Sequence, residues 1–159
     1  MPYKIGDTVV HAVYGLGKVV AIEEIDNAEL NQECYVVEIG PIKIWVPFEK
    51  AEEGSLRPPV KSNHLKTLFD ILKQPAEALP DQPYQRQIEL RQRAQLKTLD
   101  SLCCIIRDLT KRSRSHNLNI NDAQVLSRAR ENLLNEWVFS MGIQRENAMT
   151  KLDELLQEN

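Results

Sequence analysis

Side chains that carry out chemistry are sparse in this 159-residue chain, and their spacing matches no catalytic motif. The three histidines, His11, His64 and His116, fall on three separate predicted elements. The sequence contains no phosphate-binding loop, no HExxH pair and no nucleophile elbow. Gly15 and Gly17 lead into a predicted strand, whereas a dinucleotide-binding fingerprint needs a helix at that point. We therefore predict a protein that is not an enzyme and that needs no cofactor.

The three cysteines lack the CxxC spacing of a metal site or a redox pair. Cys103 and Cys104 are adjacent within an apolar run of helical periodicity, so we expect them to be buried free thiols. Free thiols are typical of the cytoplasm. No apolar run approaches the roughly 20 residues that span a bilayer, and the first residues lack the regions of a signal peptide. The sequence therefore predicts a cytoplasmic protein without a membrane partner or a bound metal.

The net charge of −3 conceals an uneven distribution of charge along the chain. Residues 1–60 contain five Lys or Arg and ten Asp or Glu, whereas residues 86–114 contain eight and three. These two segments are therefore expected to contact different partners. In a helix, spacings of seven and four residues would bring Arg86, Arg93 and Lys97 within about one face. A solvated charged face is the alternative interpretation of this segment.

The elements that must position these residues begin with a small, strongly bent antiparallel sheet. Its β-rich runs cover residues 7–10, 18–22, 34–39 and 42–46. Glycine turns separate the runs, and a polar loop is expected at residues 26–32. In the last run Val46 points to one face, while Lys43 and Trp45 point to the other. Four or five such strands predict an SH3-like or Tudor-like barrel, a fold that usually binds a partner.

The second half of the chain shows helical periodicity. The expected helices cover residues 63–73, 84–99, 101–114, 122–141 and 145–157. Ser62 and Asn121 are the expected N-caps of the first and fourth helices, and Gly142 ends the fourth. Trp137 is expected in the core, and Arg107 is expected on the outer face of the third helix.

Together these elements predict an α+β chain, in which a small SH3/Tudor-like antiparallel β-barrel precedes an all-α helical bundle. We expect the barrel at residues 1–60, a helix and a proline-rich linker at residues 61–82, and the helical domain at residues 83–159. Three prolines between residues 75 and 83 place this second boundary, because proline resists helix formation.

Taken in order along the chain, these motifs resemble the CarD/CdnL family of bacterial transcription regulators. The matching motifs of the first half are Ile5–His11, Gly15 and Gly17, Ile22-Glu23, Tyr35–Val37, Val46-Pro47, Glu49-x-Ala51 and Leu56-Arg57. Those of the second half are Leu68–Pro75, Ile105–Leu109, Leu118, Leu126–Arg130 and Leu152–Leu156. Each motif is common by itself, but their joint order over about 150 residues is specific.

The resemblance implies two contact surfaces. It implies that the Tudor-like barrel, shared with the transcription-repair coupling factor, docks on a lobe of the RNA polymerase β subunit, largely by strand pairing. It also implies that the helical domain lies on promoter DNA at the upstream edge of the melted bubble. There it would stabilise the open complex through phosphate contacts and an aromatic wedge in the minor groove. We expect no small-molecule substrate and a monomer, with a dimer through the edge at Trp45 as the alternative.

The resemblance places the polymerase contact in the last barrel strand and in the loop after the second strand. A family arginine in the last strand aligns with Trp45, and another aligns near Ile25 and Asp26. An outward tryptophan can anchor an interface, although it cannot form the salt bridge of an arginine. The expected polymerase-binding residues are Ile25, Asp26, Lys43, Trp45, Val46 and Pro47.

The resemblance places the DNA contact at the start of the helical domain. The family's minor-groove tryptophan aligns with Pro83, which precedes Tyr84, and a following arginine aligns with Arg86. Either ring could press on a base step; alternatively, Tyr84 begins a helix and packs on its neighbour. The expected DNA-binding residues are Pro83, Tyr84, Arg86, Arg93 and Lys97.

Two interpretations of function follow. In the first, the chain is a transcription regulator that binds polymerase and, weakly and without sequence preference, promoter DNA. In the second, it is a protein-only adaptor whose helices never contact DNA. The proline at the position of the family tryptophan favours the second interpretation, and the basic segment at residues 86–114 favours the first.

Overall fold

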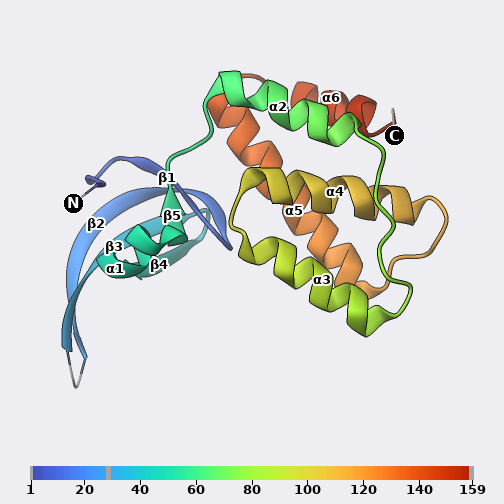
Figure 1. Ribbon diagram of the computed structural model, residues 1–159. Coiled ribbons are helices and arrows are strands. Elements are labelled where there is room, and N and C mark those ends of the chain that lie inside the picture. Colours follow the sequence, from blue (N-terminus) through green and yellow to red (C-terminus); the bar gives the residue numbers. More distant parts are fainter. Residues whose placement is uncertain (1, 28–29, 158–159) are drawn as a thin grey trace. The chain divides into compact units, whose positions relative to one another are not determined.

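The computed structural model describes residues 2–27 and 30–157 (Figure 1). The chain divides into two compact units, Met1–Pro59 and Val60–Asn159. The strands of the described residues lie in the first unit, and the five long helices lie in the second. This order confirms the predicted α+β class, with a sheet domain followed by a helical domain.

Five antiparallel strands form the sheet of the first unit in the spatial order β4-β3-β2-β1-β5. Their bounds are β1 Thr8–His11, β2 Gly15–Asn27, β3 Leu30–Ile39, β4 Ile42–Pro47 and β5 Leu56–Arg57. The register shifts between Val19 and Ala21, and such a bulge bends the strand that contains it. Strands β4 and β5 are the two edges of the described sheet and are not paired with each other, so the predicted barrel is open.

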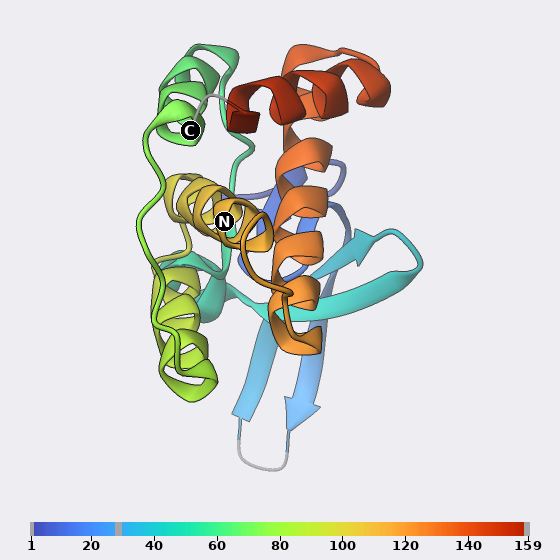
Figure 2. The same cartoon turned by 90° about the vertical axis from the view of Figure 1, so that its right-hand side faces the viewer.

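Strands β2 and β3 continue beyond the other strands as a two-stranded hairpin (Figure 2). Their pairing reaches Asp26 opposite Asn31 and continues to the last described pair, whereas β4 accompanies β3 only as far as Cys34. The prediction of a polar loop at residues 26–32 is therefore wrong. Polar side chains do not interrupt a strand when both of its faces are open to solvent. Residues 28 and 29 of that expected loop lie outside the described residues.

A small apolar core covers one face of the sheet, where α1 (Phe48–Lys50) and the following π-type turn η1 (Ala51–Ser55) lead into β5. Its buried members are Val9, Val19, Tyr35, Val37, Val46, Ala51 and Leu56. Tyr35 stacks on Phe48 with ring centroids 4.3 Å apart. Close strand packing requires glycine at position 17, because a Cβ there would lie 2.5 Å from Cγ1 of Ile39.

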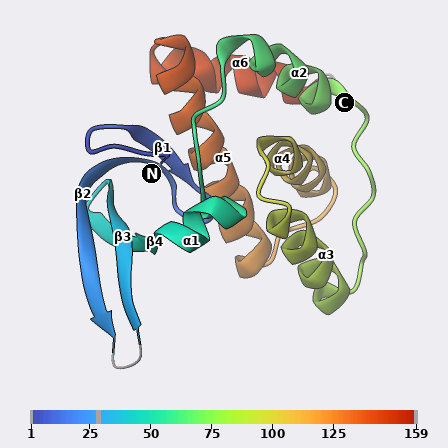
Figure 3. The ribbon, with the colours of Figure 1, turned by 60° about the vertical axis from the view of Figure 1, so that its left-hand side comes forward.

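Five helices form the second unit, with α4 packed against α2, α3 and α5 (Figure 3). Their bounds are α2 Ser62–Lys73, α3 Pro83–Gln95, α4 Leu99–Ser113, α5 Ile120–Met141 and α6 Arg145–Gln157. Apolar residues at spacings of three and four place one face of each helix in a shared core. Trp137 is 1% exposed, and its ring centroid lies 4.7 Å from that of Phe69, which confirms its expected core position.

The N-cap of α5 is Asn119 and not the expected Asn121. The side-chain oxygen of Asn119 accepts a hydrogen bond from the backbone N–H of Asp122 at 2.7 Å. Both asparagines satisfy the local preference for a cap, and the chain begins its first helical turn at the earlier one. The helix ends at Gly142 as predicted, because this residue adopts a left-handed conformation with φ of 63°.

Two other helix starts also differ from the prediction. Lys61 is the N-cap of α2, so the expected cap Ser62 is already the first helical residue. The hydroxyl of Thr98 caps α4 by accepting a hydrogen bond from the backbone N–H of Ser101. Because an N-cap residue has extended backbone geometry, the preceding helix cannot continue through Thr98. Helix α3 accordingly ends at Gln95 and not at the predicted residue 99.

Helix α2 belongs to the helical unit, although we expected its residues to lie between the two domains. Its Leu65, Leu68 and Leu72 are at most 1% exposed in the core of that unit. Just before α2, the backbone N–H of Val60 donates to the carboxylate of Glu136 on α5 at 2.7 Å. The apolar face of α2 is therefore buried against its own unit, and the proline-rich segment connects two helices of one domain.

Candidate functional site

Strand β4 carries most of the expected polymerase-binding residues and forms an edge of the sheet. One side of β4 pairs with β3, and its other side faces no strand among the described residues. Such an edge offers backbone N–H and C=O groups to a partner. Trp45 is 47% exposed and Lys43 is exposed, on the face opposite the core, which we call the outer sheet face. Val46 is buried in the core and Pro47 is half-buried.

Trp45 is oriented by a residue from another strand. Its Nε1–H donates a hydrogen bond to Oε2 of Glu23 on β2 at 2.8 Å. Glu23 was not among the expected site residues, because the two side chains are 22 positions apart and no local motif connects them. Only the pairing of both strands with β3 brings them together.

Ile25 and Asp26 lie on β2 and not in the loop expected from the sequence. Successive residues of a strand point to opposite faces. Ile25, which is 37% exposed, therefore shares the outer sheet face with Glu23, whereas Asp26 points to the other side. The structure thus places Ile25, Lys43 and Trp45 on one face and separates them from Asp26 and Val46.

The expected aromatic contact of the helical unit is well exposed. Pro83 is the first residue of α3, where proline costs no hydrogen bond. Tyr84 follows it and is 73% exposed. The helix begins here, as the alternative interpretation expected, and most of the Tyr84 side chain is open to solvent. The ring is accessible to a macromolecule.

Arg86 has a structural environment that leaves its charge no access to a phosphate. The residue is 4% exposed, and its Nε donates to the Asp122 carboxylate at 2.7 Å. Its Nη1 donates to the carbonyl oxygens of Pro80 and Asp81 at 3.0 and 3.1 Å. Arg86 therefore joins the proline-rich segment, α3 and α5, and we leave it out of the proposed DNA surface.

Arg93 and Arg107 converge on Asp108, which is 1% exposed on α4. Burial alone would lower the pKa of each guanidinium, yet hydrogen bonds to Asp108, and for Arg93 also to Glu89, raise it above the ordinary value. Arg107 is itself only 3% exposed, so its expected outward position is wrong. The reason is that Asp108 needs a buried positive partner.

The three basic residues expected on one helical face do not form such a face. Arg86 is buried, Arg93 is committed to Asp108 and Glu89, and Lys97 lies beyond the end of α3 with φ of 55°. Lys97 itself is exposed. The prediction required one continuous helix from Tyr84 to residue 99, and α3 ends at Gln95.

The exposed face of α3 contains the expected Tyr84 together with two residues that were not expected there, Ile88 and Arg91. Tyr84, Ile88 and Arg91 are separated by four and three positions, which places them within about 60° of one another around the helix. Tyr84 and Arg91 are exposed, and Ile88 is 37% exposed. We call these three residues the α3 stripe. The spacings of four and three are visible in the sequence, whereas Arg86 and Arg93 of the predicted basic face lie on the less exposed side of the helix.

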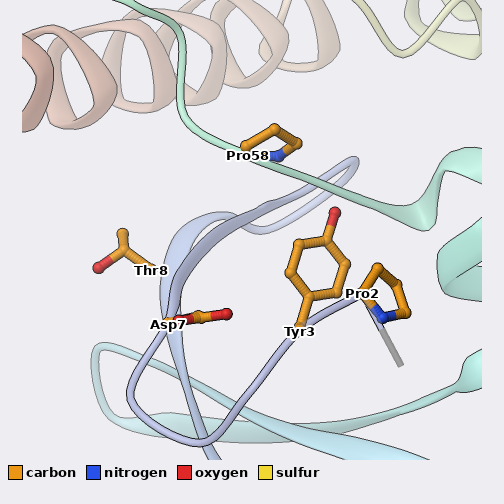
Figure 4. Close-up of a pocket in the computed structure, with 5 residues that line it drawn as sticks. All are labelled: Pro2, Tyr3, Asp7, Thr8 and Pro58. Atoms are coloured by element: carbon orange, nitrogen blue, oxygen red, sulfur yellow. The ribbon is translucent and has the colours of Figure 1, made fainter.

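A hollow of about 480 Å³ lies in the first unit, between the N-terminal segment and Pro58 (Figure 4). Tyr3 lines it together with Asp7 and Thr8. Burial raises the pKa of the Tyr3 phenol, and the nearby Tyr35 and Asp7 raise it further, while Arg57 opposes them. The lining combines prolines with one carboxylate and two hydroxyl groups, and it lies apart from β4 in the sheet order.

The described residues contain no group of three or more His, Cys, Asp or Glu placed to hold a metal ion. In the same part of the chain, no helix combines the length and the apolar character that a membrane span requires.

The chain thus combines an open sheet that has a free edge with a helical unit that has an exposed aromatic and basic stripe. Residues 3–60 match the family model described as CarD-like/TRCF RID domain, and residues 67–153 match the model described as CarD, C-terminal domain. The chain therefore belongs to the CarD-like family of transcription factors, which have an N-terminal RNA polymerase-interacting domain.

A relative from Bacillus subtilis (strain 168) carries the name "Putative transcription factor YdeB". It is 27% identical to this chain over 145 residues, and the similarity covers 89% of this chain and 94% of that protein. The similarity thus extends through both units of the structure.

Proposed function

We propose that this protein docks on the β subunit of RNA polymerase through the edge strand β4 and stabilises the promoter open complex through its helical unit. The observation that carries the proposal is the combination of a free strand edge with a half-exposed tryptophan on the same strand. Edge strands bind partners by adding a strand, and a large aromatic residue beside the edge supplies apolar contact. The protein would act where polymerase acts, in the cytoplasm.

The docking half of the proposal is tested with the isolated β-subunit lobe of the cognate polymerase. We expect micromolar or tighter binding, which Trp45→Ala weakens by about 1–2 kcal/mol because the aromatic contact is lost. Tyr14→Ala is the matched control, since Tyr14 is also a half-exposed aromatic residue of the first unit but lies in the turn between β1 and β2. Absence of binding by the unaltered protein would contradict the proposed docking.

We propose that the α3 stripe, with Pro83 and Lys97, is the surface that contacts promoter DNA. An exposed tyrosine beside an exposed isoleucine can press on a base step, and Arg91 and Lys97 can reach phosphates. Two phosphate contacts give a salt slope of only about −2 in log K, so affinity for free DNA is expected to be weak. Tethering to polymerase raises the effective concentration to about a millimolar, which makes such contacts useful.

The DNA half of the proposal is tested by the lifetime of open complexes formed with the cognate polymerase. We expect Tyr84→Ala and Arg91→Gln to shorten this lifetime without changing binding to the β lobe. Arg128→Gln is the matched control, because Arg128 is an exposed arginine of α5, outside the stripe. Tight binding of the unaltered protein to bare duplex at physiological salt would contradict the tethered mechanism.

The protein-only adaptor is the second candidate, and one observation favours it. Arg86 and Arg93, two of the three expected phosphate contacts, are committed to carboxylates within the helical unit. The same experiment separates the two candidates. If the stripe variants bind the β lobe normally and leave open-complex lifetime unchanged, the adaptor interpretation holds and the DNA contact is rejected.

A further inference from the structure

The side chain of Trp45 reaches across the outer sheet face toward β2. Trp45 is on β4 and its hydrogen-bond acceptor Glu23 is on β2, with β3 between them. Neighbouring strands are about 4.8 Å apart, so the two backbones are separated by roughly 10 Å. A 2.8 Å hydrogen bond over that distance requires both side chains to reach over β3.

The burial of β3 supports this position of the ring. Cys34 is opposite Glu23 and Val36 is opposite Trp45 in the strand register, so both point to the outer sheet face. They are nonetheless only 1% and 2% exposed. Burial also raises the pKa of the Cys34 thiol. Their burial requires a cover on this face, and it is consistent with a Trp45 side chain that crosses β3 to reach Glu23.

This geometry determines what Trp45 can offer a partner. The one hydrogen-bond donor of its side chain is already used by Glu23. Trp45 is still 47% exposed, so a partner can reach the apolar ring surface but not a free N–H. The π-face of an aromatic ring carries partial negative charge and attracts cations.

The charged group that contacts the indole, the carboxylate of Glu23, is also negative. No Lys, Arg or His occurs between residues 19 and 42, so the residues next to Glu23 along β2 and opposite it on β3 are not basic. The basic residue of β2, Lys18, is opposite Glu38. Lys43 lies two residues from Trp45 on the outer sheet face and, like Lys18, is opposite Glu38 in the register. A cation approaching Trp45 from solvent would thus meet a negative ring face beside a carboxylate.

We propose that Trp45 and Glu23 together form a receptor for an arginine side chain of the polymerase β lobe. The guanidinium would stack on the exposed face of the indole and pair with the Glu23 carboxylate. Arginine fits better than lysine, because its planar guanidinium stacks on aromatic rings while still donating to a carboxylate. This inference rests on the proposed docking function, which it deepens by naming the partner group and its charge.

The test compares two variants with the same change in net charge, using the full chain and the β-subunit lobe of the cognate polymerase. Glu23→Gln keeps an oxygen that can accept from the indole N–H but removes the negative charge. Glu33→Gln is the control, since Glu33 is on the opposite face of the same hairpin. We expect Glu23→Gln to weaken lobe binding about five- to tenfold and to reduce its salt dependence, and Glu33→Gln to change affinity less than about twofold.

Equal affinities for the two glutamine variants would overturn the inference while leaving docking intact. Failure of the unaltered protein to bind the lobe would instead overturn the docking proposal, so the two failures can be told apart. A second measurement identifies the partner group. Blocking the arginines of the lobe with 1,2-cyclohexanedione should abolish the difference between the variants, and acetylating its lysines should not. The reverse result would overturn the assignment of arginine.

Discussion

Buried charge at single residues determines much of the stability of the helical unit. Asp122 is 1% exposed and its carboxylate is paired with Arg86. Removal of one partner of such a pair leaves the other charged and without compensation in a poorly hydrated site. We therefore expect Arg86→Ala to lower the free energy of unfolding by about 3–5 kcal/mol, measured by urea denaturation.

Arg91→Ala is the control for this experiment, because the same substitution on the exposed face of α3 should change stability by no more than about 0.5 kcal/mol. The assignment of Arg86 as a structural residue would be wrong if the two variants were equally stable. A DNA role for Arg86 would instead appear as lost open-complex stability in a normally folded protein.

The thiols give a second prediction at the residue scale. Burial raises the pKa of Cys103 far above its ordinary value, and it raises that of the half-buried Cys104 as well. The thiolate is the reactive form, so a raised pKa lowers the reactive fraction at pH 8. We expect iodoacetamide at pH 8 to label Cys103 much more slowly than Cys104, measured by peptide mapping. Both should react at similar rates in guanidinium chloride; fast native labelling of Cys103 would refute its burial.

At the scale of elements, the start of α5 depends on one cap. Asn119 accepts the N–H of Asp122, while Asn121 is an exposed residue of the first turn. Loss of an N-cap typically costs about 1 kcal/mol. We expect Asn119→Ala to lower the free energy of unfolding by about that amount and Asn121→Ala to change it by less than about 0.5 kcal/mol. If Asn121→Ala were instead the more destabilising variant in thermal or chemical denaturation, Asn121 would be the N-cap, as expected from the sequence.

At the scale of the whole molecule, each unit has its own apolar core. Domains with separate cores generally unfold as separate cooperative units. Leu68 is fully buried in the helical core, so Leu68→Ala should destabilise that unit by about 2–5 kcal/mol. We expect hydrogen exchange to show lost protection in α2, α4 and α5 with unchanged protection in β2 and β3. Equal loss in both units would show that they unfold together.

Sequence periodicity was sufficient to predict the order of strands and helices along the chain, because their side-chain patterns follow from local backbone geometry. The core position of Trp137 and the end of α5 at Gly142 were predicted correctly. The joint order of motifs likewise identified the family, since it requires residue types in sequence and not their contacts.

The partners of charged side chains were decided only by the tertiary structure. Arg86 and Arg107 resemble surface residues in the sequence, yet both are buried. Arg86 pairs with Asp122 of α5, and Arg107, which is next to Asp108 on α4, also donates to the backbone carbonyl of Ile71 in α2. The contact of Trp45 with Glu23 likewise requires two strands to pair with a third. Periodicity tells which residues share a face of one element. It does not tell which element covers that face, and burial of charge is favourable only where the covering element supplies the opposite charge.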